Sequence, residues 1–141
     1  PIIVRLFNII GPNQLSKYGM VVPKFIEAAL KDEDILIHGD GSQSRSFTWV
    51  EDVVNYIIKL AEIKAYGEIF NIGQTEEITI KDLAELVILK TNSNSKIIYK
   101  SHEDVFGKAF EDPKRRTPGI EKIIEFTGMK QQKILNLWLK I

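Results

Sequence analysis

Side chains suited to metal or thiol chemistry are scarce in this sequence of 141 residues. It has no cysteine, and its two histidines, His38 and His102, lie far apart without the short spacing of zinc ligands. Thiolate chemistry is therefore excluded, and we expect no metal site. The lack of cysteine also fits a reducing compartment.

Residues 39–41, Gly-Asp-Gly, resemble the start of a glycine-rich phosphate loop. Such a loop needs a helix directly after it, so that the phosphates lie at the helix N-terminus. Residues 44–47, Ser-Arg-Ser-Phe, do not begin a helix. We therefore interpret residues 39–41 as a turn. An arginine after such a turn, here Arg45, is by itself more often a solvated surface charge.

The elements that must position the polar residues are a mixture of strands and helices. The sequence predicts strands at residues 2–7, 35–38, 47–50, 68–72 and 96–99, with an extended segment at 77–79. It predicts helices at residues 21–30, 51–63, 80–90, 120–127 and 133–139, and a long loop at 102–119. Thr79 is expected to cap its helix, with Asp82 at the third helical position. The predicted fold class is α/β, mixed α and β.

Composition excludes several classes of function. Apolar residues make up 44% and charged residues 27%, with a formal net charge of zero, so no nucleic-acid partner is expected. The basic residues 114–116 form only a local cluster beside two acidic residues. No apolar run approaches the roughly 20 residues that span a bilayer, and no signal peptide is recognisable. We expect a cytoplasmic protein without a membrane partner.

Five short motifs occur in a fixed order along the chain. They are Arg-Leu-Phe-Asn-Ile-Ile-Gly-Pro at residues 5–12, Val-Val-Pro-Lys-Phe at 21–25, the run from Ile37 to Asp52 with Gly-Asp-Gly-Ser-Gln-Ser-Arg at 39–45, Phe-Asn-Ile-Gly at 70–73, and Asp-Pro-Lys-Arg-Arg-Thr-Pro at 112–118. Together they resemble the extended short-chain dehydrogenase/reductases, in particular the NAD-dependent nucleotide-sugar epimerases and dehydratases. The resemblance spans nearly the whole chain and corresponds to the C-terminal, substrate-binding portion of that family.

The resemblance implies that arginine and asparagine hold the diphosphate of a nucleotide-sugar. Arg45 matches the arginine on the diphosphate, a role suited to a guanidinium because it is always charged and donates in a fork. Arg116 matches a second arginine near the phosphates or ribose. Asn8 and Asn71 match asparagines that hydrogen-bond the diphosphate or the sugar hydroxyls.

Other positions match the surroundings of the base and of the cofactor. The backbone at Val21, together with Leu36 and His38, corresponds to the pocket around the base. Phe7 lies where the family's chain passes the nicotinamide. NAD itself would be bound mainly by an N-terminal half that is missing here, and the substrate would be a UDP- or dTDP-hexose.

Each assignment has a structural alternative. Asn8 and Asn71 could cap strand ends, as asparagine often does in turns. Arg115 could take the role of Arg116, or the pair could only solvate a loop. A plain surface histidine is as good an interpretation of His38 as a residue that stacks on the base.

Three departures from the family pattern limit the chemistry. No tyrosine has a lysine four positions later, so the family's Tyr-x-x-x-Lys base is missing. We therefore predict no catalytic residue and an inactive chain. Asn13 stands where sugar-acid decarboxylases usually have arginine, which counts against decarboxylation although residues 112–116 resemble that subgroup. Gly119 replaces an acidic residue that can contact the ribose, so the nucleotide preference stays open.

The sequence begins with a strand-like run, whereas chain termini usually lie at the surface. We therefore expect a fragment: one C-terminal substrate-binding domain over residues 1–141, in which residues 1–10 are a remnant of the last strand of a Rossmann sheet that is mostly missing. A strand without sheet partners should expose apolar surface and favour self-association. The family is commonly dimeric, so a full-length parent is expected to be a homodimer.

Two functional hypotheses remain. In the first, the chain is part of an NAD-dependent epimerase or dehydratase, or of a nucleotide-sugar-acid decarboxylase. In the second, it is a non-catalytic module that binds a nucleotide-sugar or a protein partner. The coding sequence upstream of Pro1 separates them, because a Tyr-x-x-x-Lys motif there favours the enzyme and a start codon at Pro1 excludes it.

Overall fold

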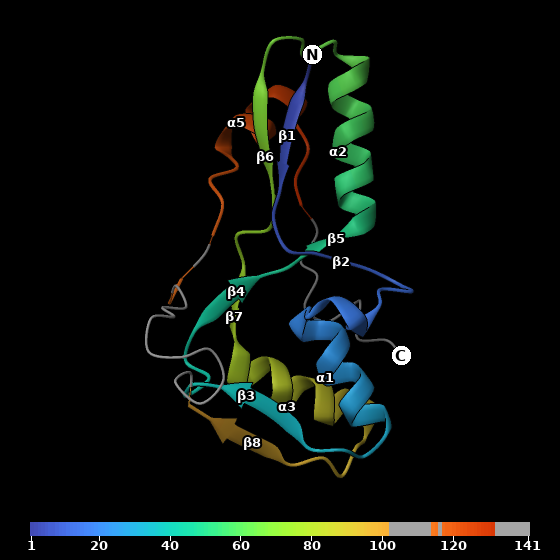
Figure 1. Cartoon of the computed structure of the whole chain (residues 1–141). Coiled ribbons are helices and arrows are strands. Elements are labelled where there is room, and N and C mark those ends of the chain that lie inside the picture. The colour runs from blue at the N-terminus through green and yellow to red at the C-terminus, as the bar shows by residue number, and fades with distance from the viewer. Residues whose placement is uncertain (102–113, 116, 132–141) are drawn as a thin grey trace. The chain divides into compact units, whose positions relative to one another are not determined.

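A computed structural model describes residues 1–101, 114–115 and 117–131 of the chain (Figure 1). The chain divides into two compact units. Unit 1 comprises Pro1–Pro12, Ser46–Glu77 and, as far as it is described, Thr117–Trp138. Unit 2 comprises the described residues of Asn13–Arg45 and Ile78–Arg116. The expectation of one substrate-binding domain, with residues 1–10 as a strand remnant, remains an expectation.

Unit 1 is built around a parallel strand pair. Strand β1 (Ile3–Leu6) pairs in parallel with β6 (Ile69–Ile72), in a register that places Ile3 beside Ile69 and Leu6 beside Ile72. A shorter parallel pair joins β2 (Ile9–Ile10) to β5 (Thr48–Trp49). Parallel strands need a crossover between them, and helix α2 (Val50–Glu62) supplies it before β6 (Figure 1).

Two helices cover one face of the β1–β6 pair. Helix α2 has no glycine or proline, and Glu51 and Asp52 in its first turn complement the positive end of the helix dipole. Helix α5 (Glu121–Thr127) packs against both α2 and β6. The shared core consists of Val53, Tyr56, Leu60, Ala65, Phe70, Ile72, Ile120 and Ile123.

Charged and aromatic side chains form contacts between α5 and the start of β6. The Lys122 Nζ lies 2.7 Å from Glu68 Oε2 and 5.1 Å from the centre of the Phe70 ring. The Phe70 and Phe126 rings meet edge to face, with centroids 5.2 Å apart. Such contacts each add on the order of 1 kcal/mol.

Unit 2 pairs strand β3 (Ile35–His38) in parallel with β8 (Ile97–Lys100) and packs two helices on one face. Helices α1 (Val21–Leu30) and α3 (Ile80–Thr91) contact each other and β3. Ile35 and Ile37 are buried beneath them, whereas the intervening Leu36 is 36% exposed, as the alternation of a strand requires. The Asp32 carboxylate joins the helix ends by accepting from Ser93 Oγ at 2.9 Å and Asn94 N at 2.7 Å.

The remaining elements connect these pairs. A 3-10 turn, η1 (Ser16–Tyr18), precedes α1. Strands β4 (Ser44–Ser46) and β7 (Glu77–Thr79) form a fourth pair. Thr79 caps α3 through its Oγ1, which accepts from Asp82 N at 3.0 Å, as the sequence predicts. The predicted mixed α/β class is confirmed, and the expected helix at 133–139 lies outside the described residues, as does most of the loop at 102–119.

Some apolar side chains stay exposed. On β1 these are Ile3 and Leu6, and on α2 they are Val54, Ile57 and Ile58. The apolar surface that the sequence predicts is therefore present, while self-association remains a prediction. None of the helices in the described part of the chain combines the length and apolar character that crossing a membrane requires.

The buried phenol of Tyr56 should make the stability of the unit 1 core depend on pH in the alkaline range. Its side chain is 1% exposed and its hydroxyl donates to the Met129 carbonyl at 3.4 Å. Burial, helped by the negative charge of Asp52, raises the pKa of the Tyr56 phenol. Its contribution to stability is thus complete below the unfolded-state pKa of about 10 and is lost as pH rises through the folded-state pKa.

We expect Tyr56→Phe to make the free energy of unfolding less dependent on pH above about 10. The measurement is urea unfolding at a series of alkaline pH values. Tyr66→Phe, at a ring that is 67% exposed, controls for removal of a phenol outside the core. Equal pH slopes for the wild type and Tyr56→Phe would contradict the assignment.

Candidate functional site

Leu36 and His38, the predicted base contacts, lie on β3 with their backbone groups on the edge that faces away from β8. Ile35 N donates to Lys96 O at 2.8 Å and Gly39 N donates to Lys100 O at 2.7 Å, so alternate residues bond β8. The N–H and C=O groups of Leu36 and His38 therefore point away from β8. Consistent with this, Gln43 Nε2 donates to the His38 carbonyl at 3.0 Å. The His38 carbonyl thus has a side-chain partner on this edge, and contact of Leu36 and His38 with a base stays a prediction.

The turn after β3 is held by two glycines and an aspartate. Gly39 and Gly41 have φ values of 79° and 76°, which favour glycine. Asp40 Oδ1 accepts from Ser42 Oγ at 2.6 Å and Ser42 N at 2.9 Å, and these bonds lower the pKa of its carboxyl. The turn leads into β4 rather than into a helix, so its interpretation as a turn and not a phosphate loop is confirmed.

Arg45 is positioned by β4, directly after this turn. One of its five N–H groups donates to the Ser44 carbonyl at 2.7 Å, and Ser44 N donates to the Lys114 carbonyl at 3.0 Å. The side chain is half-buried. A guanidinium that is already held by a main-chain carbonyl through one nitrogen loses less side-chain entropy when its other N–H groups bind an anion.

Val21 begins α1 without a side-chain cap. The preceding residue, Met20, has extended backbone angles and makes no capping hydrogen bond with its side chain. The N–H groups of a first helical turn have no acceptor within the helix. The backbone at Val21 therefore suits an acceptor atom of a ligand, which is the role that the resemblance implies.

An open, shallow pocket of about 600 Å³ lies at the carboxyl ends of β3 and β8 in unit 2. It is lined by Gly39, Asp40, Tyr99, Lys100 and Ser101. In open parallel sheets, ligands bind beyond the carboxyl ends of the strands. Gly39, which follows His38 and bonds Lys100 of β8, is one of the lining residues.

In unit 1, Phe7 and Asn8 follow the carboxyl end of β1 and are fixed by the main chain. Phe7 N donates to Ile72 O at 3.0 Å, and Thr48 Oγ1 donates to Phe7 O at 2.9 Å. Asn8, with a φ of 40°, donates its Nδ2 to Ser46 O at 3.0 Å. The Asn8 amide thus has a structural partner, and its predicted binding role remains a prediction.

Asn71 and Gly73 lie at the carboxyl end of β6. Asn71 Nδ2 donates to the Gly119 carbonyl at 3.1 Å, which ties β6 to the segment before α5. Gly73 is enclosed, since a Cβ there would lie 2.4 Å from Pro118 Cγ and 3.0 Å from Phe7 Cβ. This hydrogen bond supports the alternative interpretation, in which Asn71 has a structural role.

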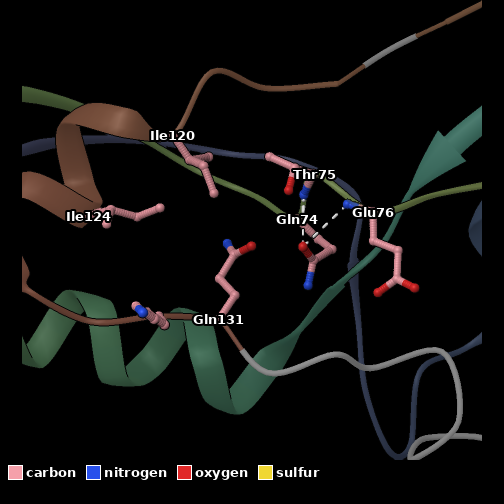
Figure 2. Close-up of a pocket in the computed structure, with 7 residues that line it drawn as sticks. Gln74, Thr75, Glu76, Ile120, Ile124 and Gln131 are labelled. Carbon is pink, nitrogen blue, oxygen red and sulfur yellow. Dashed lines mark hydrogen bonds between the residues drawn. The ribbon is translucent and has the colours of Figure 1, made fainter.

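A second cavity, of about 430 Å³, lies in unit 1 (Figure 2). Gln74 Oε1 accepts from Thr75 N at 2.8 Å and from Glu76 N at 3.3 Å, and Gln131 Nε2 donates to the Gly73 carbonyl. The other lining residues are Ile120, Ile124 and Lys130. Of the predicted binding residues that the structure describes, none lines this cavity.

The predicted residues thus fall into two groups. Val21, Leu36, His38 and Arg45 belong to unit 2, whereas Phe7, Asn8 and Asn71 belong to unit 1. Arg116 lies outside the described residues.

Sequence analysis missed two positioning residues. Gln43 holds the turn, and the buried Thr48 holds the end of β1. The only sequence signal for Thr48 is a hydroxyl between two aromatic residues just before a helix.

The comparison with sequence families agrees with the motifs. The model of the NAD dependent epimerase/dehydratase family matches residues 1–73 of the 141. The chain therefore belongs to the NAD dependent epimerase/dehydratase family.

Two curated relatives are similar over most of the chain. UDP-N-acetyl-alpha-D-glucosaminuronate decarboxylase of Bacillus cytotoxicus is 42% identical over 124 residues, which cover 87% of this chain and 39% of that protein. UDP-glucuronic acid decarboxylase 4 of Arabidopsis thaliana is 34% identical over 139 residues, covering 99% of this chain and 30% of the relative. The chain thus spans less than half the length of either.

A solved structure with a similar fold is UDP-glucuronic acid 4-epimerase of Bacillus cereus, in complex with UDP-glucuronic acid and NAD. It is 25% identical with a TM-score of 0.84, over 99% of this chain and 42% of that one. This similarity confirms the fold that the motifs predict.

The family is NAD-dependent, and the described residues can be tested against that cofactor. A dinucleotide needs a glycine-rich loop that opens a helix, whereas the turn at residues 39–41 opens β4. Phe7 offers a half-buried apolar side chain, but both its main-chain groups are bonded within unit 1. The turn at residues 39–41 therefore does not fit the phosphates of NAD, and contact of Phe7 with the nicotinamide stays a prediction.

Gly73→Ala tests how tightly the ends of β1 and β6 are packed. We expect a loss of about 1–3 kcal/mol in the free energy of unfolding, because the new methyl group meets Pro118 and Phe7. Gly119→Ala is the control, because a Cβ there meets only the end of the Glu121 side chain, at 3.2 Å. Urea unfolding measures both, and equal losses would contradict the packing argument.

Proposed function

We propose that the chain binds the nucleoside diphosphate part of a nucleotide-sugar through unit 2. One observation carries the proposal: the backbone groups of Leu36 and His38 that point away from β8, and the half-buried Arg45, lie within one stretch of eleven consecutive residues, Ile35 to Arg45. The backbone edge suits the hydrogen-bonding rim of a base, and the guanidinium suits a diphosphate.

The comparisons favour UDP as the nucleotide. The two curated relatives are named for UDP-sugars, and the similar Bacillus cereus structure holds UDP-glucuronic acid. All three names also refer to a sugar acid, which carries a carboxylate on the hexose. We therefore propose a UDP-hexuronic acid as the substrate of the full-length protein.

For the reaction, sequence similarity favours a decarboxylase parent, because both curated relatives have that activity. Asn13, where the resemblance leads us to expect arginine in decarboxylases, is the observation that favours epimerisation instead. In either case the chain by itself is proposed to be inactive, since its sequence lacks the Tyr-x-x-x-Lys pair. Its contribution would be to bind and orient the substrate.

A calorimetric titration of the 141-residue chain with UDP, dTDP and GDP tests the proposal. We expect saturable binding, strongest for UDP. Arg45→Ala should weaken it by about 1.5–3 kcal/mol, or roughly ten- to a hundredfold, as for loss of a charged hydrogen bond.

Arg5→Ala is the matched control, because it removes the same charge from an exposed residue of unit 1. Equal weakening by both variants would indicate a general charge effect rather than a site. No binding of any nucleotide by the wild type would contradict the proposal that this chain alone forms the site. Turnover of UDP-glucuronic acid with NAD by the chain alone would contradict its inactivity.

A further inference from the structure

The side chain of Gln43 closes the turn between β3 and β4 in unit 2. Its Nε2 donates to the His38 carbonyl at 3.0 Å, five positions back along the chain. A carbonyl group can only accept, so the amide nitrogen faces His38 and the amide oxygen, Oε1, is turned away from it. No group in the described part of the chain donates to this oxygen. Gln43 is half-buried, and its Oε1 is not enclosed by the described residues.

The main chain of Gln43 is held by the start of helix α3. Ile80 N donates to the Gln43 carbonyl at 3.0 Å, and Lys81 N donates to the Gly41 carbonyl at 3.0 Å. These are the first two N–H groups of α3, which have no acceptor inside the helix. The turn therefore caps α3, and α3 in return fixes the turn. Because Gln43 is held at both its main chain and its amide, its Oε1 has a defined position before any ligand binds.

Gln43 lies between two predicted contacts of a nucleotide. Its amide bonds the main chain of His38, a predicted base contact, and Arg45, the predicted diphosphate contact, follows two positions later. Two residues of extended chain span about 7 Å, and side chains two positions apart lie on the same face. In a nucleoside diphosphate, the ribose lies between the base and the diphosphate. The Gln43 amide therefore occupies the place in this order that corresponds to the ribose.

We infer that Gln43 Oε1 accepts a hydrogen bond from a ribose hydroxyl of the bound nucleotide, which makes Gln43 a specificity-determining residue. This inference rests on the proposed function. A fixed carbonyl oxygen suits a ribose because the hydroxyl group can donate. A ligand without that hydroxyl leaves the oxygen unpaired, and polar sites reject such analogues for this reason. Gln43 thus distinguishes an intact ribose from a deoxyribose.

Calorimetric titration of the 141-residue chain with UDP, 2′-deoxy-UDP and 3′-deoxy-UDP tests the contact. We expect one of the two deoxy analogues to bind roughly three- to tenfold more weakly than UDP, as for loss of a neutral hydrogen bond. The weaker analogue identifies the hydroxyl that donates to Gln43. This comparison uses the wild type and does not depend on the folding of any variant.

Gln43→Met removes the amide at similar side-chain size. UDP should then bind no better than the weaker deoxy analogue, so that the preference for the intact ribose disappears. Arg45→Ala should instead weaken UDP and both analogues by the same factor, because it removes a contact common to all three. Circular dichroism verifies that the variants remain folded.

Gln131→Met is the matched control. Gln131 also donates its Nε2 to a main-chain carbonyl, that of Gly73, but it belongs to unit 1. The variant therefore removes the same kind of hydrogen bond away from the proposed site. We expect it to leave the preference for UDP over the deoxy analogues unchanged.

Four results overturn the inference. Equal affinity of the wild type for UDP and both deoxy analogues excludes the contact while leaving the proposed function intact. A preference that persists in Gln43→Met assigns the ribose hydroxyl to another group. Tighter binding of UDP by Gln43→Met means that the amide blocks the site. Absence of UDP binding by the wild type overturns the proposed function and this inference with it.

Discussion

The hydroxyl group of Thr48 is the contact on which the strand ends of unit 1 depend. It donates to the Phe7 carbonyl at 2.9 Å and accepts from Gln74 N at 3.0 Å, so one buried atom joins the residues that follow β1 and β6. Thr48 is 1% exposed, and a buried polar group in this position must be paired to avoid a desolvation penalty of about 1–3 kcal/mol. Because these two bonds satisfy it, Phe7 has a defined place, and Asn8, which bonds Ser46 beside it, does too.

In unit 2 the equivalent constraint is the alternation of strand β3. Pairing with β8 uses the backbone groups of every second residue, which leaves those of Leu36 and His38 on the opposite edge of the strand. The same alternation buries Ile35 and Ile37 under α1 and α3. Core packing therefore fixes the register of β3 against β8, and that register determines which backbone groups point away from β8. The position of Arg45 follows, since a turn with two left-handed glycines returns the chain into β4.

Membership in the NAD dependent epimerase/dehydratase family accounts for the order of the motifs, and the exposed apolar residues raise a separate question. The chain covers about two fifths of the Bacillus cytotoxicus relative, and it leaves Val54, Ile57 and Ile58 in solvent. These exposed apolar residues fit a chain that spans less than half the length of the relatives that it matches.

The amino-acid sequence by itself determined the elements and the family. Hydrophobic spacing predicted α1 at its observed bounds and α2 and α3 within one residue, and the Thr79 cap was readable because a cap depends only on neighbours in the chain. Motif order predicted the family, which the match at residues 1–73 bears out. Only the tertiary structure decided what each polar group contacts. Asn8, Thr48 and Asn71 bond carbonyl groups 38, 41 and 48 positions away, and no local pattern encodes such partners. The physical reason is that a cap or a helix face is set by the next few residues, whereas a buried hydrogen bond is set by whichever distant segment the packing of the core brings alongside.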